Sequence, residues 1–177
     1  MSNIRRTLKR KEIPGHARYL TFSCYRCLPL FNNDRIKQLF VDQLELTRNR
    51  LDIKVYAWVI MPEHVHLLMM PTSTVTVSHF LRALKRPFSA KVLARWREID
   101  APILKQIKDK KGSSHFWQPG GGYDRNIVSD QEMLEKVGYI HANPVRRELT
   151  NQATDWPWSS ALWYDQRKGM AMDPLPL

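Results

Sequence analysis

The chain has 177 residues, 43% of them hydrophobic and 25% charged, which suits one domain with a sizeable core. Its 28 lysines and arginines against 17 aspartates and glutamates give a formal net charge of +11, which favours a polyanionic partner. No long apolar segment and no apolar stretch after the basic N-terminus is present, so we expect neither a membrane anchor nor a signal peptide. Nucleic acid is the expected partner, and a basic surface without a specific partner stays open.

Residues 1–15 are interpreted as a basic arm that becomes ordered on a polyanion. Residues 16–28 alternate or run apolar and predict a first strand, which would contain Cys24 and Cys27. Residues three apart face opposite ways along a strand, and no second cysteine pair exists to complete a zinc site. Both cysteines are therefore interpreted as reduced packing residues of a cytoplasmic protein.

The centre of the predicted fold is a pair of apolar strands, 53–61 and 64–70, rich in β-branched, aromatic and aliphatic residues. Because side chains alternate along a strand, His64 and His66 project from one face. Two neutral imidazoles at this spacing can bind one divalent metal ion. Two half-exposed strand histidines fit the spacing equally well, so a third ligand elsewhere has to decide.

A helix is predicted on each side of this strand pair. Asn33 is the expected N-cap of the first, which ends near Arg50. The second follows the threonine-rich segment 72–76, and Pro87 predicts a kink or a restart within it. Its polar side is one-sided in charge, although a solvated face explains that too: Arg82, Lys85, Arg86, Lys91, Arg95 and Arg97.

The region after the second helix is harder to interpret. Residues 98–114 accumulate lysines around Pro102 and are treated as a basic surface excursion. The glycines 120–122 predict a flexible turn, because no Gly-Lys-Ser/Thr follows them as a phosphate loop requires. Residues 123–128 alternate and predict a fourth strand.

A capping-box pattern, Ser129-x-x-Glu132, predicts a helix that runs to about Ala142 and stops before Pro144. Its expected apolar stripe consists of Met133, Leu134, Val137 and Ile140.

Tyr139 lies outside this stripe and shares a helix face with Asn143, four residues further on. A nucleophile beside a metal ligand fits this pair, and so does an amphipathic tyrosine at the edge of the core with Asn143 as a helix cap. His141 lies well round the helix from Tyr139 and is interpreted as structural or DNA-facing.

Several of these motifs, in this order, resemble a known family. Met61-Pro-Glu-His-Val-His66 resembles the histidine–hydrophobe–histidine motif of HUH endonucleases, and the segment from Tyr139 to Arg146 resembles the helix of single-tyrosine transposases. Three further segments resemble those of the REP-associated tyrosine transposases: 116–118, 123–125 and 155–160. The resemblance runs from about residue 16 to residue 161.

The resemblance implies an α+β fold, a ferredoxin-like (RRM-like) antiparallel sheet with helices packed on it. The HUH single-tyrosine transposase domain would span residues 16–145, after the N-terminal arm 1–15. A C-terminal tail, residues 146–177, would pack on this domain.

The implied function is that of a metal-dependent single-stranded DNA endonuclease and strand transferase, cleaving beside REP-like hairpins through a 5′-phosphotyrosine intermediate. Tyr139 would be the nucleophile, and His64, His66 and Asn143 the metal ligands. Nitrogen ligands alone would suit zinc or nickel as well, whereas the family points to Mg²⁺ or Mn²⁺. The alternative is a module that binds a hairpin without cutting it. A monomer in a prokaryotic cytoplasm, associated with the nucleoid, is expected.

Seven basic residues are the expected phosphate contacts: Arg5, Arg6, Arg82, Lys85, Arg86, Arg146 and Arg147. Trp117 and Tyr123 could stack on unpaired bases, and core packing fits each at least as well. Residues 98–114 and 120–122 depart from the family pattern, which leaves their contacts with substrate open.

Overall fold

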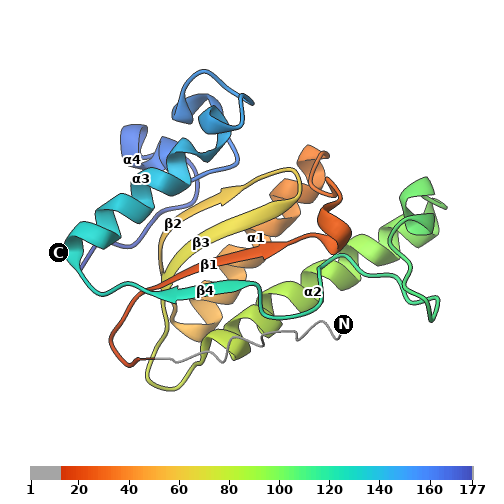
Figure 1. Cartoon of the computed structure of the whole chain (residues 1–177), viewed down its shortest axis with the longest axis horizontal. Helices are drawn as coiled ribbons and strands as arrows, with labels where there is room; N and C mark the ends of the chain where they lie inside the picture. Colours follow the sequence, from red (N-terminus) through yellow and green to blue (C-terminus); the bar gives the residue numbers. More distant parts are fainter. Residues whose placement is uncertain (1–12, 177) are drawn as a thin grey trace, which may run out of the picture.

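Four strands form one antiparallel sheet in the order β2-β3-β1-β4, in the computed structural model of residues 13–176 (Figure 1). The strands are β1 (Arg18–Ser23), β2 (Lys54–Ile60), β3 (His64–Met70) and β4 (Tyr123–Asn126). With helices between β1 and β2 and between β3 and β4, the chain follows the βαββαβ order of ferredoxin-like folds. The predicted α+β class is confirmed. Arg5 and Arg6 lie outside the described residues, as does most of the predicted arm.

Helices cover both faces of the sheet (Figure 1). On one face, α1 (Asp34–Leu51) and α2 (Val77–Glu98) pack against the side chains of Leu20, Val65 and Leu67. On the other face, α3 (Asp130–Arg146) packs against Leu68 and other side chains of β1, β2 and β3. Short helical segments lie in the connections: η1 (Tyr25–Cys27), η2 (Pro102–Lys105), η3 (Ala153–Asp155) and α4 (Ala161–Gln166). Alternation along each strand thus supplies two apolar clusters.

The predicted helix starts are confirmed by their caps. The side chain of Asn33 accepts a hydrogen bond from the backbone N–H of Arg35, and Ser129 accepts one from Glu132 N–H. The Glu132 carboxylate accepts from the N–H of Val128, the residue before the N-cap, so the start of α3 is not the reciprocal capping box that the pattern predicted.

The helix restart predicted as one option at Pro87 and the helix end predicted before Pro144 are wrong. Pro87 lies inside the continuous helix α2, and Pro144 lies inside α3, which runs on to Arg146. A proline removes one helical hydrogen bond, but packing on both sides of it outweighs that local loss here. Leu84 and Phe88 on α2 are fully buried. The boundary predicted after residue 145 falls within the last turn of α3.

Three smaller expectations are also wrong. The first strand ends at Ser23 instead of Leu28, because Arg26 and Cys27 adopt positive φ angles of 54° that no strand allows. Cys24 is buried as expected, whereas Cys27 is exposed. Leu134 is 47% exposed and does not belong to the apolar stripe of α3.

The C-terminal segment covers the outer edge of β2. Backbone N–H groups of Ile60 and Ser160 donate to the carbonyl oxygens of Trp158 and Trp58, at 2.8 and 2.9 Å. The indole N–H of Trp156 donates to Ile60 O at 3.0 Å. Paired in this way, the edge of β2 does not present free hydrogen-bonding groups along these residues.

His141 joins α3 to this C-terminal segment. Its Nε2 lies 2.8 Å from Ser160 Oγ, and its ring lies 5.1 Å from that of Tyr164. His141 is therefore structural, one of the two roles that the sequence left open.

Gly122 holds the start of β4 against β1. Its φ angle is +70°, and a Cβ atom placed on it would lie 2.1 Å from Thr21 O. The glycine run is thus a close backbone approach at this position and not only a flexible turn.

We expect Gly122→Ala to lower the free energy of unfolding by about 2–4 kcal/mol, because the new methyl group meets a backbone oxygen and the φ angle is strained. Urea denaturation would measure this change. The control is Gly138→Ala on α3, where the added Cβ has nothing within 4 Å. That variant should gain about 0.5–1 kcal/mol from helix propensity. Equal stability of the two variants would contradict the close approach.

Burial lowers the pKa of His141 from 6.5 to about 4. Below pH 6.5 the unfolded chain takes up a proton on this histidine that the folded chain does not. The protein should therefore lose stability as the pH falls from 6.5 towards 4, by up to about 1.4 kcal/mol per pH unit from this group. Urea denaturation across this range should give a shallower pH dependence for His141→Gln than for the wild type. Parallel curves would contradict the prediction.

Candidate functional site

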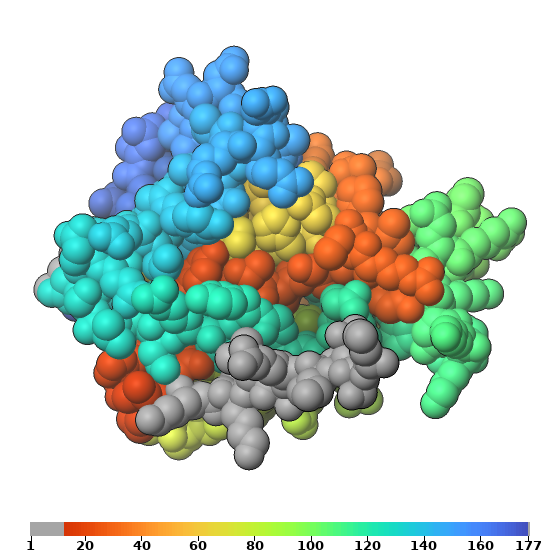
Figure 2. All heavy atoms as spheres, viewed as in Figure 1, coloured from red at the N-terminus to blue at the C-terminus, as the bar shows by residue number. Residues whose placement is uncertain are grey.

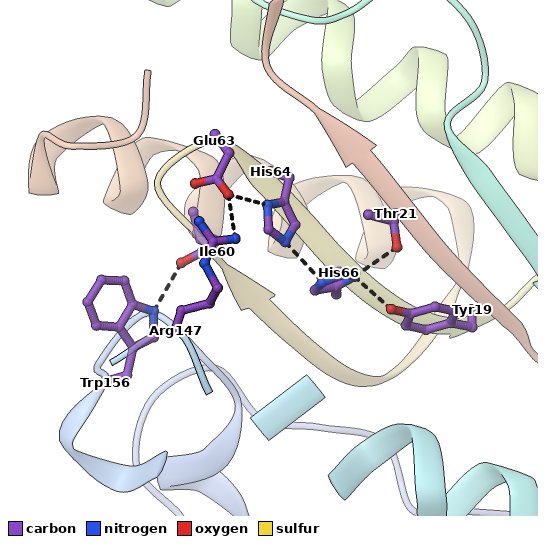
Figure 3. A network of polar contacts seen from close by, with 8 residues as sticks. All are labelled: Tyr19, Thr21, Ile60, Glu63, His64, His66, Arg147 and Trp156. Carbon is purple, nitrogen blue, oxygen red and sulfur yellow. Dashed lines mark hydrogen bonds and ion pairs between the residues drawn. The ribbon is translucent and has the colours of Figure 1, made fainter. Parts of the chain in front are cut away.

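Two imidazoles of β3 face each other at the centre of the site (Figure 3). The Nε2 atoms of His64 and His66 lie 3.0 Å apart, with the ring planes at 80°. β3 lies between β1 and β2, where His66 pairs with Thr21 and Val59. Both neighbouring strands therefore fix the backbone that carries the pair.

The other ring nitrogen of each histidine also has a partner (Figure 3). His64 Nδ1 lies 3.1 Å from Glu63 Oε1, and because a carboxylate only accepts, this nitrogen carries the proton. His66 Nδ1 lies 2.7 Å from the Tyr19 hydroxyl and 2.8 Å from Thr21 Oγ1. His64 thus turns the lone pair of its Nε2 towards His66.

Burial keeps both imidazoles neutral at neutral pH. It lowers the pKa of His64, against the opposing effect of Glu63, and lowers that of His66 to about 3. The neutral imidazole is the form that binds metal ions. Two ring nitrogens this close need a proton or a cation between them, because facing lone pairs repel.

Tyr139 and Asn143 reach the histidines from α3. The Tyr139 ring meets His66 edge-on, with centroids 5.7 Å apart, and 37% of this residue is exposed. Asn143 is 7% exposed, its Nδ2 donates to Tyr139 O at 2.9 Å, and its side chain lies close enough to His66 to oppose the lowering of that group's pKa. The structure therefore brings together the four residues predicted as nucleophile and ligands. Asn143 is not a helix cap, because α3 continues to Arg146.

Two cations flank the ring of Tyr139. Arg146 Cζ lies 5.0 Å from the ring centroid, and Lys136 Nζ lies 5.6 Å from it. Lys136 also lies 5.4 Å from the ring of Tyr19, whose pKa burial raises to about 12. Lys136 is not among the site residues predicted from the sequence, although it precedes Tyr139 by three residues and helical spacing could have found it.

Arg147 forms an ion pair with another residue of the protein at this site. Its Nη1 donates to Glu63 Oε1 at 2.9 Å, so one carboxylate oxygen links the end of α3 to His64 (Figure 3). The sequence analysis considered Arg147 only as a phosphate contact and assigned no role to Glu63.

The remaining predicted contacts lie elsewhere. Arg82, Lys85 and Arg86 of α2 line a separate hollow of about 400 Å³, with Trp117 and Gly120 on its other walls. The helix α2 covers one face of the sheet, and α3 covers the opposite face. The structure does not bring these three residues together with the histidine pair.

The two aromatic candidates for base stacking differ. Trp117 is buried in the core, where its ring lies 5.2 Å from that of Phe22. Tyr123 is 49% exposed and lies 6.0 Å from Tyr19, on the face of the sheet that carries the histidine pair.

The donor set fits one divalent cation. Two metal–nitrogen bonds of about 2.1 Å at a right angle span about 3.0 Å, which is the observed Nε2 separation. Within residues 13–176 no group of three histidine, cysteine, aspartate or glutamate side chains could hold a metal ion. A third protein ligand here would be the amide oxygen of Asn143.

No helix of the described residues is long and apolar enough to cross a membrane.

Comparison with known proteins identifies the family of the chain. The family model described as "Transposase IS200 like" matches residues 19–143. A REP-associated tyrosine transposase of Escherichia coli K12 is 27% identical over 135 residues, which cover 72% of this chain and 70% of that protein. A solved structure of a REP-associated tyrosine transposase bound to a REP hairpin is 20% identical. It superposes with a TM-score of 0.66 over 99% of this chain and 96% of its own. The chain therefore belongs to the IS200-like transposase family, as a relative of the REP-associated tyrosine transposases.

Proposed function

We propose that this transposase-family protein is a metal-dependent, single-stranded DNA endonuclease and strand transferase that acts through Tyr139. The observation that carries the proposal is the facing pair of Nε2 atoms, 3.0 Å apart, with the Tyr139 ring at His66 of the same chain. A site complete within one chain supports a monomer. The net charge of +11 supports a DNA substrate.

His64, His66 and Asn143 would hold the cation, Mg²⁺ or Mn²⁺. All three ligands are neutral, so a bound divalent ion would keep its full charge for the phosphate oxygens and polarise the phosphorus. Glu63 fixes the proton of His64 on Nδ1, which leaves Nε2 free to bind.

Tyr139 would attack the phosphorus of a single-stranded phosphodiester. A bond forms between its Oη and phosphorus, and the bond from phosphorus to the 3′-oxygen breaks. The phenol loses its proton and the leaving 3′-oxygen gains one. Because the 5′ end stays attached as a phosphotyrosine, a 3′-hydroxyl can reverse the step and join strands without another energy source. A free phenol is a weak nucleophile at neutral pH, so the attack would depend on a strongly polarised phosphorus.

The structured substrate would be a hairpin beside the cleaved strand. The solved relative bound to a REP hairpin supports this choice. Arg146 lies at Tyr139 and would contact phosphate there, while Arg82, Lys85 and Arg86 would contact a more distant part of the DNA. Arg5 and Arg6 would add contacts from the N-terminal arm, and Arg147 would do so only by sharing its guanidinium with Glu63.

We expect Tyr139→Phe to abolish covalent attachment of DNA while hairpin binding stays within about twofold, because only the nucleophilic oxygen is removed. The assay is incubation with labelled hairpins that carry single-stranded flanks, in Mn²⁺, followed by a denaturing gel and peptide mass spectrometry.

The matched control is Tyr123→Phe, an exposed tyrosine on the same face of the sheet, which should keep the adduct. An adduct on the phenylalanine variant at 139 would overturn the assignment of the nucleophile. Tight, salt-sensitive binding by the wild type without any adduct would instead favour a non-cleaving, hairpin-binding module.

We expect Glu63→Ala to weaken Mn²⁺ binding by about 10–100-fold, because the carboxylate orients His64 through Nδ1. Glu63→Gln should lose less, since its amide oxygen can accept the same hydrogen bond. Isothermal titration calorimetry would measure both. Glu135→Ala, which removes an exposed carboxylate of α3, is the control. Equal affinities for the Glu63→Ala variant and this control would show that Glu63 does not orient a ligand.

A further inference from the structure

The chain between α2 and β4 forms a lobe that the proposed reaction does not use. The lysine lobe, defined here as residues 97–114, contains the end of α2, the segment η2 and a β-bridge between Lys108 and Ser114. Figure 1 shows it, in green, projecting beyond the end of the sheet.

Hydrogen bonds and core packing give the lobe a defined conformation. The Asp109 carboxylate accepts from the backbone N–H groups of Lys111 and Ser113, at 2.8 and 2.9 Å, and contacts His115 Nε2 at 2.8 Å. Ile107 is fully buried in the main core. The turn around Asp109 and the buried side chain of Ile107 thus fix the segment that carries the lysines.

The lobe carries a net positive charge, with five cationic side chains against three carboxylates. Its exposed basic residues are Arg97, Lys105, Lys108, Lys110 and Lys111. Of its three carboxylates, Glu98 pairs with Arg95 at 2.8 Å, and Asp109 is occupied by the turn. Within residues 13–176 none of the four lysines forms an ion pair. Arg97, Lys105 and Lys108 line a hollow of about 750 Å³, whose lining also includes the carboxylate of Asp100 and the hydroxyl residues Ser113 and Ser114.

The lobe lies at the same end of the sheet as the histidine pair. Arg26 Nη1 donates to Gln106 O at 3.2 Å, and the ring of Tyr25 lies 5.2 Å from that of His115. The next residue back, Cys24, donates its N–H to Glu63 O at 2.8 Å, beside His64. Figure 2 shows yellow and orange residues at the surface between the green lobe and the blue residues that follow α3.

We propose that the lysine lobe binds the phosphates of the double-stranded stem of a DNA hairpin whose unpaired strand lies at the histidine pair. This inference rests on the proposed function. A duplex carries one charge per ~1.7 Å of its axis, and lysines contact its phosphates as point charges without reading sequence. Single strands are bound by aromatic stacking as well, and residues 97–114 contain no aromatic side chain. The composition therefore favours a duplex.

The test compares two variants that each remove three exposed positive charges. The lobe variant is Lys105→Gln, Lys108→Gln and Lys111→Gln, and the control variant, away from the lobe, is Arg50→Gln, Lys54→Gln and Lys168→Gln. Fluorescence anisotropy would give the Kd across a salt series for hairpins with a short or a long stem and the same single-stranded flank. Covalent attachment to a stemless oligonucleotide would be measured in parallel.

We expect the lobe variant to bind the long-stem hairpin at least tenfold more weakly than the control variant. The slope of log K against log salt should fall by about 2–3, since each lost phosphate contact removes about 0.9. Attachment to the stemless oligonucleotide should not change.

Equal binding of the long-stem hairpin by the two variants would overturn the proposal. A similar loss of covalent attachment to the stemless oligonucleotide by the lobe variant would also overturn the proposal, because the lobe would then contact the single strand. If the wild type forms no adduct but the lobe variant still loses stem binding, the proposed catalysis fails and the stem contact stands.

Discussion

The position of β3 between two other strands is the constraint on which the site depends. Hydrogen bonds from β1 and β2 fix the pleat of β3, so alternation assigns its side chains to two faces without freedom to slip. Val65 and Leu67 enter the core beneath α1 and α2. His64 and His66 therefore have to face α3, and the burial that stabilises the sheet also keeps their rings neutral.

The second half of the site comes from α3, which packs on the sheet and is also joined to it by ion pairs. Ile140 is buried against the strands, whereas Tyr139, its neighbour, turns its ring to the edge of His66. The ion pair between Arg147 and Glu63 connects the end of this helix to the strand turn that carries the histidines. Strand geometry thus fixes one half of the site, and helix packing with an ion pair at each end of α3 fixes the other.

Much of this arrangement could be predicted from the sequence, because it depends on local periodicity. Strand alternation placed the histidines on one face, and helical spacing placed Tyr139 and Asn143 together. The pair formed by Glu63 and Arg147 joins residues 84 apart, so no local pattern encodes it. The helices continue through their prolines because tertiary packing outweighs a local loss of one hydrogen bond, which a pattern of residue types does not measure.

The C-terminal segment that covers the edge of β2 affects the order in which the chain can fold during synthesis. Ser160 pairs with the backbone of Trp58 and also contacts His141, which belongs to the helix of the tyrosine. The ribosome makes β2 and β3 early. The outer edge of β2 and the side of α3 that carries His141 gain their partner only when residue 160 has been synthesised. Until then a nascent chain would carry Tyr139 on a helix that lacks one of its supports. The segment that closes the sheet edge therefore also completes the support of the tyrosine helix.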